Sequence, residues 1–239
     1  MRVLVVTAVP VERDAVTRAF GGTAETVALP GGELHRCGPF DVLAGGAGPA
    51  AAAAATAFAL ASASASASAP YGLVVSAGIG GAFTPLTPLG SLVVASDLVA
   101  ADLGADTPEG FLPVTALGFG RDRFTAPPAL VRAVAAATGA TAGPVLTVST
   151  VTGTAERAAD LLAAHPGALA EAMEGFGVAE AAARAGVPVV ELRAVSNAVG
   201  PRDRDAWRIG DALAALTDAF GKIAPALEGW NRHDDRHRS

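Results

Sequence analysis

Short uninterrupted runs of apolar residues recur along the chain and alternate with alanine-rich segments. The runs at residues 3–7, 72–77, 91–97, 146–150 and 187–195 have the pattern of strands that are buried on both faces. Residues 50–61, 128–138, 154–164, 175–185 and 209–227 have the pattern of helices between them. Because both faces of such a sheet need covering helices, the alternation predicts an α/β fold with three layers, α/β/α, around a mixed, mostly parallel central sheet.

The length of 239 residues suits one large domain with a sizeable core. We assign residues 1–230 to this domain and expect residues 231–239 to form a disordered tail. Residues 24–45 predict an antiparallel meander, and the Ala-Ser repeat at 61–69 is interpreted as a loose helix end and linker.

The composition excludes several classes of partner. A net charge of −6 and an aromatic content of 5% provide neither a basic stripe nor stacking platforms, so we expect no nucleic-acid partner. No apolar stretch has the length of a signal peptide or a bilayer span, so we expect no membrane association. The single cysteine, Cys37, excludes an intrachain disulfide and favours a cytoplasmic location.

Two glycine-rich segments follow predicted strands. The first contains Gly46 and Gly48 and precedes an alanine-rich helix, and the second contains Gly78, Ile79 and Gly80. Glycine turns expose backbone N–H groups, and the carboxyl ends of neighbouring parallel strands meet at one edge of the sheet. The pattern therefore predicts two turns beside one binding site, although tight strand-to-helix turns need glycine in any case.

Acidic and polar side chains stand at other strand and helix ends. Glu12 follows the first strand, Glu174 follows Met173 at the head of a helix, and the strand after that helix ends in Ser196 and Asn197. We predict that these residues converge on one pocket. The alternative is structural: a carboxylate in a first helical turn complements the helix dipole, and Asn is a common turn residue.

Taken in order, these parts resemble the nucleoside phosphorylase and nucleosidase superfamily over nearly the whole chain. The resemblance rests on Glu12 after the first strand, the two glycine-rich segments, the Met173-Glu174-Gly175 motif and the run from Arg193 to Asn197. In the methylthioadenosine/S-adenosylhomocysteine nucleosidases the last motif ends in Asp, whereas here it ends in Asn.

Residues 196–204 and Trp207 are more similar to the futalosine hydrolases of the alternative menaquinone pathway. This resemblance implies hydrolysis of the N-glycosidic bond of futalosine, with release of hypoxanthine and dehypoxanthine futalosine. It also implies a homo-oligomer. We expect no cofactor and no metal, because the four histidines show no ligand spacing.

The chemistry of this bond requires negative charge near an oxocarbenium-like ribose and a base for the attacking water. We assign the water to Glu12 and the ribose 2′-hydroxyl to Glu174. Asn197 can donate to O6 and accept from N7–H, so it favours a 6-oxopurine over adenine. The predicted substrate-binding residues are Gly46, Gly48, Gly78, Ile79, Gly80, Met173, Ser196 and Trp207.

Some roles stay open at this point. Arg121, Arg123, Arg202, Arg204 and Arg208 are candidates for a carboxylate on the substrate tail, and Trp207 either covers the purine or anchors the last helix. Residues 102–123 have no clear period and are a candidate substrate-covering loop. The alternative functions are a purine nucleoside phosphorylase, a methylthioadenosine-type nucleosidase, and a non-catalytic purine-nucleoside-binding protein.

Overall fold

The computed structural model describes residues 1–30, 32–65 and 69–230. Its helices are α1 (Pro10–Ala19), α2 (Pro49–Ala65), α3 (Pro128–Thr138), α4 (Ala155–Ala164), α5 (Gly175–Arg184) and α6 (Ile209–Gly229), with a 3₁₀ turn η1 (Arg204–Ala206). The first strands are β1 (Arg2–Thr7), β2 (Glu25–Leu29), β3 (Gly32–Cys37), β4 (Phe40–Ala44), β5 (Tyr71–Ala82) and β6 (Leu92–Ala100). The later strands are β7 (Gly104–Thr107), β8 (Gly110–Pro113), β9 (Arg123–Thr125), β10 (Thr141–Thr147), β11 (Ala170–Ala172) and β12 (Val189–Ala198).

A mixed sheet forms the centre of the molecule, in the order β11-β10-β6-β12-β5-β1-β4-β3-β2. β1 pairs in parallel with β4 and β5, and β5 pairs in parallel with β12, so their carboxyl ends share one edge. β11 also pairs antiparallel with β5, which closes β5, β12, β6, β10 and β11 into a ring. The sequence did not predict this closure, which brings β11 to the edge where β5 and β12 end.

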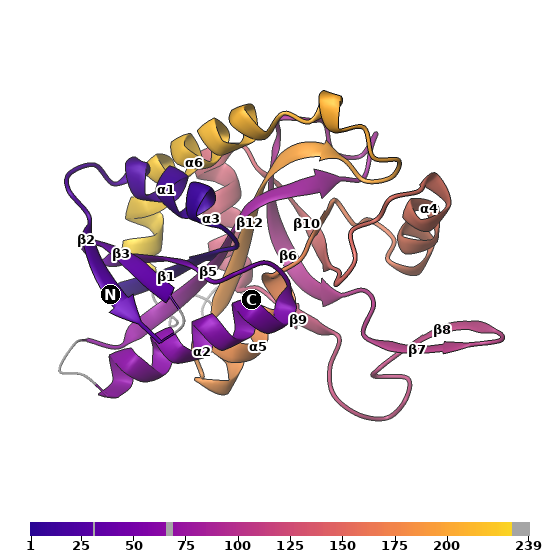
Figure 1. Cartoon of the computed structure of the whole chain (residues 1–239), viewed down its shortest axis with the longest axis horizontal. Coiled ribbons are helices and arrows are strands. Elements are labelled where there is room, and N and C mark those ends of the chain that lie inside the picture. Colours follow the sequence, from indigo (N-terminus) through magenta and orange to yellow (C-terminus); the bar gives the residue numbers. More distant parts are fainter. Residues whose placement is uncertain (31, 66–68, 231–239) are drawn as a thin grey trace.

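Helices cover both faces of this sheet, as predicted for an α/β/α fold. α2 packs on α5 on one side, and α6 packs on α1 and α3 on the other (Figure 1). Residues Val3 to Val6 of β1 are fully buried between these layers. No helix of the described chain is long and apolar enough to cross a membrane.

Most predicted elements are confirmed, with small shifts of their ends. The meander of β2, β3 and β4 is antiparallel, α3 has the predicted bounds, and Thr154 caps α4 by accepting from the N–H of Arg157. The strand predicted at 91–97 extends to Ala100, and the one predicted at 146–150 is instead Thr141–Thr147. α2 continues through half of the Ala-Ser repeat to Ala65, because alternating alanine and serine do not interrupt a helix.

The second glycine turn was a wrong prediction. Residues 78–82 continue β5 as a strand, because their backbone is paired with β12 through Ala82 and with β11 at Gly81 and Ala82. The glycines serve close approach instead of a turn: a Cβ at Gly80 would lie 3.0 Å from the carbonyl oxygen of Glu171. The predicted tail at 231–239 lies outside the described residues.

Candidate functional site

A cavity of about 260 Å³ opens where β1, β5, β11 and β12 meet. Eight of the eleven predicted site residues line it: Glu12, Ile79, Gly80, Met173, Glu174, Ser196, Asn197 and Trp207. They come from five separate parts of the chain. The convergence expected from the sequence is therefore present in the structure.

Glu12 is fixed by backbone N–H groups from two sides. Its Oε2 accepts from Ala8 (3.0 Å) and Val9 (3.3 Å), and its Oε1 accepts from Ile79 (2.9 Å). Glu12 lies in the first turn of α1, and the bond from the N–H of Val9 caps this helix. Glu12 therefore does support the start of the helix. The same carboxylate lines the cavity, and the two roles coexist.

Gly78 lies directly behind this carboxylate. A Cβ here would lie 2.7 Å from Oε1 of Glu12 and 2.8 Å from Nη1 of Arg193, both too close for a side chain. Gly78 is not in the cavity wall. Gly78 leaves space for the buried charges of Glu12 and Arg193. The predicted contact of Gly78 with the substrate is not supported, because Gly78 does not line the cavity.

Glu174 stands at the head of α5 but makes no side-chain bond to its own helix. Its Oε1 accepts from the N–H of Gly48 (3.2 Å), and its Oε2 accepts from the N–H of Met173 (3.3 Å). The turn of Gly46 and Gly48 thus meets the site through Glu174, and neither glycine lines the cavity. α5 can approach the start of α2 because Gly177 has no side chain: a Cβ there would lie 2.1 Å from the carbonyl oxygen of Pro49.

Arg193 connects the charged groups behind the cavity. Its guanidinium is fully buried, with Nη1 3.2 Å from Oε2 of Glu174 and Nε 2.8 Å from Oε1 of Glu191. Its Nη2 donates to the hydroxyl of Ser76 at 3.1 Å. Arg193 belongs to a motif of the predicted site but had no predicted role, and Glu191 was not among the predicted site residues. A charged pair with i, i+2 spacing inside an apolar strand was the available signal, because unpaired charges are almost never fully buried.

Three carboxylates share this single guanidinium. Burial raises the pKa of Glu12 above its usual 4.5, and the neighbouring Glu174 raises it further, against the N–H of Ile79 and the charge of Arg193. Burial also raises the pKa of Glu191. Burial opposes the charge of Arg193, but the carboxylates outweigh it and raise its pKa. The cluster therefore sets three carboxyl groups against one guanidinium, and two of them, Glu12 and Glu174, line the cavity.

Asn197 lies at the end of β12 with part of its hydrogen-bonding capacity unused. Its Oδ1 accepts from the hydroxyl of Ser196 (2.8 Å), and its Nδ2 donates to the carbonyl of Ala198 (2.9 Å). A primary amide has two donors and two acceptor lone pairs, so one of each remains. The structure thus leaves Asn197 able both to donate and to accept in the cavity.

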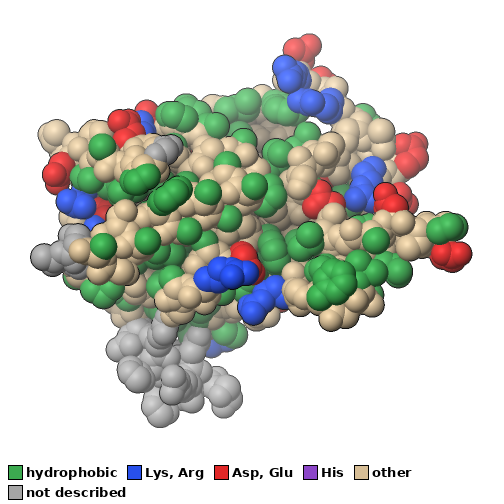
Figure 2. All heavy atoms as spheres, turned by 60° about the horizontal axis from the view of Figure 1, so that its bottom comes forward, with side chains coloured by type: hydrophobic (Ala, Val, Ile, Leu, Met, Phe, Trp, Pro, Cys, Tyr) green, Lys and Arg blue, Asp and Glu red, His purple; other side chains and the backbone are tan. Residues whose placement is uncertain are grey.

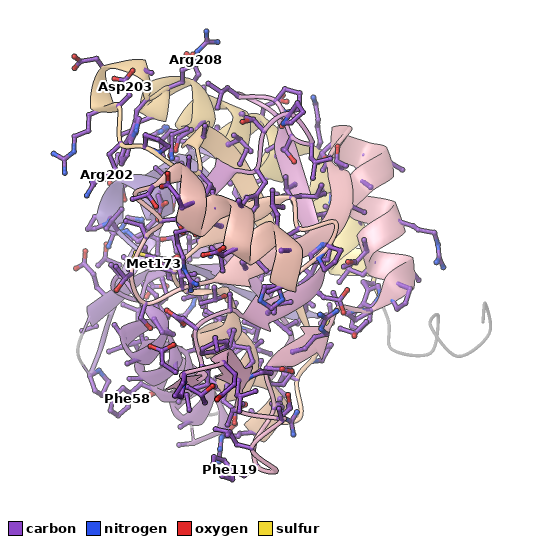
Figure 3. All side chains as sticks on the ribbon, turned by 90° about the vertical axis from the view of Figure 1, so that its right-hand side faces the viewer. Phe58, Phe119, Met173, Arg202, Asp203 and Arg208 are labelled. Atoms are coloured by element: carbon purple, nitrogen blue, oxygen red, sulfur yellow. The ribbon has the colours of Figure 1, made fainter. Side chains whose placement is uncertain are left out.

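Among the five candidate arginines, Arg202 lines the cavity beside Trp207, with its guanidinium carbon 5.6 Å from the centre of the indole ring. Figure 3 places Met173 and Arg202 on the same side of the molecule and shows Arg208 extending outward at the start of α6. Arg121 lies over Phe124, and Arg123 pairs with Asp97. Arg121, Arg123, Arg204 and Arg208 do not line the cavity.

Residues 102–123 do not cover this cavity within the chain. They include the hairpin of β7 and β8, which projects from the body of the molecule (Figure 1), and none of them is in the cavity wall. The predicted covering role is therefore not met within one chain. Nor does the part of the chain that the structure describes contain a group of three or more His, Cys, Asp or Glu residues placed to hold a metal ion.

Comparisons with known proteins identify the family. The family model described as "Phosphorylase superfamily" matches residues 4–227. Futalosine hydrolase from Streptomyces coelicolor is 66% identical over 235 residues, which cover 98% of this chain and 100% of the relative. Futalosine hydrolase from Acidothermus cellulolyticus is 43% identical over 228 residues, which cover 93% of this chain and 90% of the relative.

Solved structures of more distant proteins share the fold. The 5′-methylthioadenosine/S-adenosylhomocysteine nucleosidase of Neisseria meningitidis, in complex with methylthio-immucillin-A, has a TM-score of 0.79 at 19% identity, covering 94% of this chain and 99% of the other. The S-adenosylhomocysteine nucleosidase of Streptococcus pyogenes has a TM-score of 0.80 at 20% identity, covering 95% and 97%. At this identity the likeness establishes the architecture alone.

Proposed function

The chain belongs to the phosphorylase superfamily, among the futalosine hydrolases, and from this premise we propose that it hydrolyses the N-glycosidic bond of futalosine through the carboxylates described above. The relatives are named futalosine hydrolases, and the proposed products are the hypoxanthine and dehypoxanthine futalosine that the resemblance implies. The observation that carries the assignment of residues is the pair Glu12 and Glu174 on one cavity. Behind the cavity, Arg193 forms an ion pair with Glu174 and acts electrostatically on Glu12.

In the proposed reaction, the bond between C1′ and N9 breaks while a water oxygen bonds to C1′. Glu12 takes one proton from this water, and the other stays on the new 1′-hydroxyl. The departing purine takes up a proton from solvent at N7, and Glu12 then returns its proton to solvent, so that no proton is gained or lost overall. Positive charge develops on the ribose as the bond lengthens, and the excess of carboxylates stabilises it. Glu174 accepts from the ribose 2′-hydroxyl, and this bond strengthens as the charge grows.

The charge of the cavity favours water over phosphate as the nucleophile. A phosphate dianion would approach two carboxylates, Glu12 and Glu174, while the nearest buried cation, Arg193, is already bound to Glu174 and Glu191. The negative charges of phosphate and of the two carboxylates repel one another strongly in a site of low dielectric constant. A hydrolase is therefore favoured over a phosphorylase.

An assay of free-base release in phosphate-free buffer, which measures hypoxanthine or adenine according to the substrate, tests the function. We expect turnover of futalosine to exceed that of inosine, aminodeoxyfutalosine and methylthioadenosine, with no dependence on added phosphate. A product carrying a 1-phosphate would overturn the hydrolase assignment, and nucleoside binding without base release would indicate a binding protein. Equal turnover of inosine would remove the claim that the tail is recognised.

Asn197 is the proposed reader of the purine O6 and N7 positions. Asn197→Asp replaces the donating amide by a carboxylate that only accepts, which suits the amino group of adenine and repels O6. We expect the ratio of kcat/KM for 6-oxo over 6-amino substrates to fall by about 10- to 100-fold, the range of one hydrogen bond to a charged group. An unchanged ratio between futalosine and aminodeoxyfutalosine would show that Asn197 does not read the base.

Arg202 is the proposed partner of the carboxylate on the substrate tail, and Trp207 lies beside it. Of the five candidates, it lines the cavity and is exposed at its rim, as a group that meets a charged tail from solvent must be. The indole of Trp207 adds an apolar surface next to the guanidinium.

We further propose a homo-oligomer in the cytoplasm. The α2 face supports the first point, because α2 carries no charged residue, exposes 49% of Phe58 and lies where hydrophobic side chains gather in Figure 2. The presence of a single, unpaired cysteine, Cys37, supports the second.

A further inference from the structure

Glu171 is a buried carboxylate in the cavity that the reaction above does not use. It lies in β11, is 5% exposed and contributes to the cavity wall. Its Oε1 accepts from the N–H of Thr152 (2.8 Å), and its Oε2 accepts from the hydroxyl of Thr152 (2.5 Å). Both partners come from one residue of the loop between β10 and α4, so the carboxylate is held in one orientation.

The ring closure of the sheet places Glu171 near Asn197. Gly81 of β5 is in register with Glu171 on one side and with Asn197 on the other. Their backbones are therefore two strand spacings apart, about 10 Å. Gly81 between them has no side chain, and a Cβ there would lie 3.2 Å from Nδ2 of Asn197. One flat heterocycle can meet both side chains across this glycine.

The carboxylate keeps capacity for a further donor. An ionised carboxylate offers about four lone-pair positions, and Thr152 uses two of them. Burial raises the pKa of Glu171, and the two bonds from Thr152 act against this rise. Another N–H donor from a ligand would offset the desolvation of the charged form in the same way.

Purines with different groups on C6 also differ at N1, the ring atom next to the C6 group that Asn197 is proposed to recognise. A 6-oxopurine carries a hydrogen on N1 beside O6, so N1 is a donor. In a 6-aminopurine N1 is an acceptor and would face the lone pairs of a carboxylate. A fixed carboxylate beside N1 therefore accepts a hydrogen bond from a 6-oxopurine and repels a 6-aminopurine.

We propose that Glu171 is a specificity-determining residue that accepts a hydrogen bond from N1–H of the purine, so that Glu171 and Asn197 together select a 6-oxopurine. This inference rests on the proposed function, because it assumes that the cavity holds the base. It assigns the base end of the cavity to the space between β11 and the end of β12, with the ribose toward Glu12 and Glu174.

Calorimetric binding of free hypoxanthine and free adenine tests the inference without requiring turnover. We expect Glu171→Gln to weaken hypoxanthine binding by about 10- to 100-fold, the range of a hydrogen bond to a charged group. Adenine binding should stay equal or improve, because the amide can donate to N1. The Thr152 hydroxyl can accept from the same amide, so the loop contact is retained.

Further variants separate recognition from support of the fold. Glu171→Met introduces an apolar side chain of similar length and should also lower the ratio of hypoxanthine affinity to adenine affinity. Glu156→Gln, an exposed carboxylate in the first turn of α4, is the matched control and should leave the ratio unchanged. A merely structural role would weaken the binding of both bases equally. The inference would be overturned if a folded Glu171 variant kept the ratio of hypoxanthine affinity to adenine affinity unchanged.

The two proposals fail in different ways. If the unaltered protein releases no hypoxanthine from futalosine, the proposed function fails. If it does release hypoxanthine and the Glu171 variants keep the ratio of base affinities, the role of Glu171 fails alone.

Discussion

Glu12→Gln is expected to lower kcat/KM for futalosine by about 100-fold or more, the scale of a lost general base. The amide keeps the size of the side chain but cannot take a proton from water. The loss should be found mainly in kcat, because Glu12 acts on the nucleophile. Steady-state hypoxanthine release measures it, with Asp14→Asn as a control: this carboxylate lies on the same helix, is 46% exposed and should leave the rate unchanged.

The pH profile provides an independent check on Glu12. The base works only when deprotonated, so activity falls as the pH decreases through the pKa of Glu12 in the folded protein. Because burial raises that pKa, the midpoint of this acid limb should lie above 4.5. The limb should disappear in the residual activity of Glu12→Gln. A variant that keeps both the rate and the limb would place the base elsewhere.

Arg193→Met is expected to destabilise the protein by about 3 to 5 kcal/mol at pH 7, the cost of breaking a buried ion pair from one side. Glu191 and Glu174 would lose their shared cation, and Glu191 is fully buried with its Oε2 already without a hydrogen-bond partner among the described residues. Urea unfolding at several pH values measures the change. Arg184→Met is the control, because Arg184 is 80% exposed, and its pair with Glu180 contributes about 1 kcal/mol or less.

The pH dependence of this loss has a defined sign. Burial already raises the pKa of Glu191 in the folded state, and Arg193 counteracts this rise, so without Arg193 the pKa of Glu191 would lie still further above its value in the unfolded chain. The folded state would then bind more protons, so stability would fall as pH rises from the usual carboxylate range to the raised pKa values. The deficit of Arg193→Met should therefore be smaller at acid pH. Adding Glu191→Gln should recover part of it, and a deficit below about 1 kcal/mol at pH 7 would contradict the buried pair.

Most elements of this fold could be predicted because their signals are local. The buried run of β1 and the bounds of α3 follow from uninterrupted apolar residues and from Pro128 and Gly139 at the helix ends. Residues 78–82 were misassigned because glycines at a strand end look the same whether they make a turn or allow close approach. These residues form a strand because they pair with β12 on one side and with β11 on the other. No local sequence pattern predicts such pairing.

The sequence by itself determined the order of the helices and of the longer strands, although it did not predict β7, β8, β9 or β11. It also identified Glu12, Glu174 and Asn197 as the residues with suitable chemistry. Only the tertiary structure decided that Arg193 pairs with Glu174 and Glu191, that Gly48 donates to Glu174, and that Gly78 leaves space behind Glu12. It also decided that Glu171 shares the cavity with Asn197. The physical reason is that propensity and hydrophobic period act between neighbours in the chain. Charge and hydrogen bonding depend instead on which groups share one buried volume, and the closure of β11 onto β5 sets that volume.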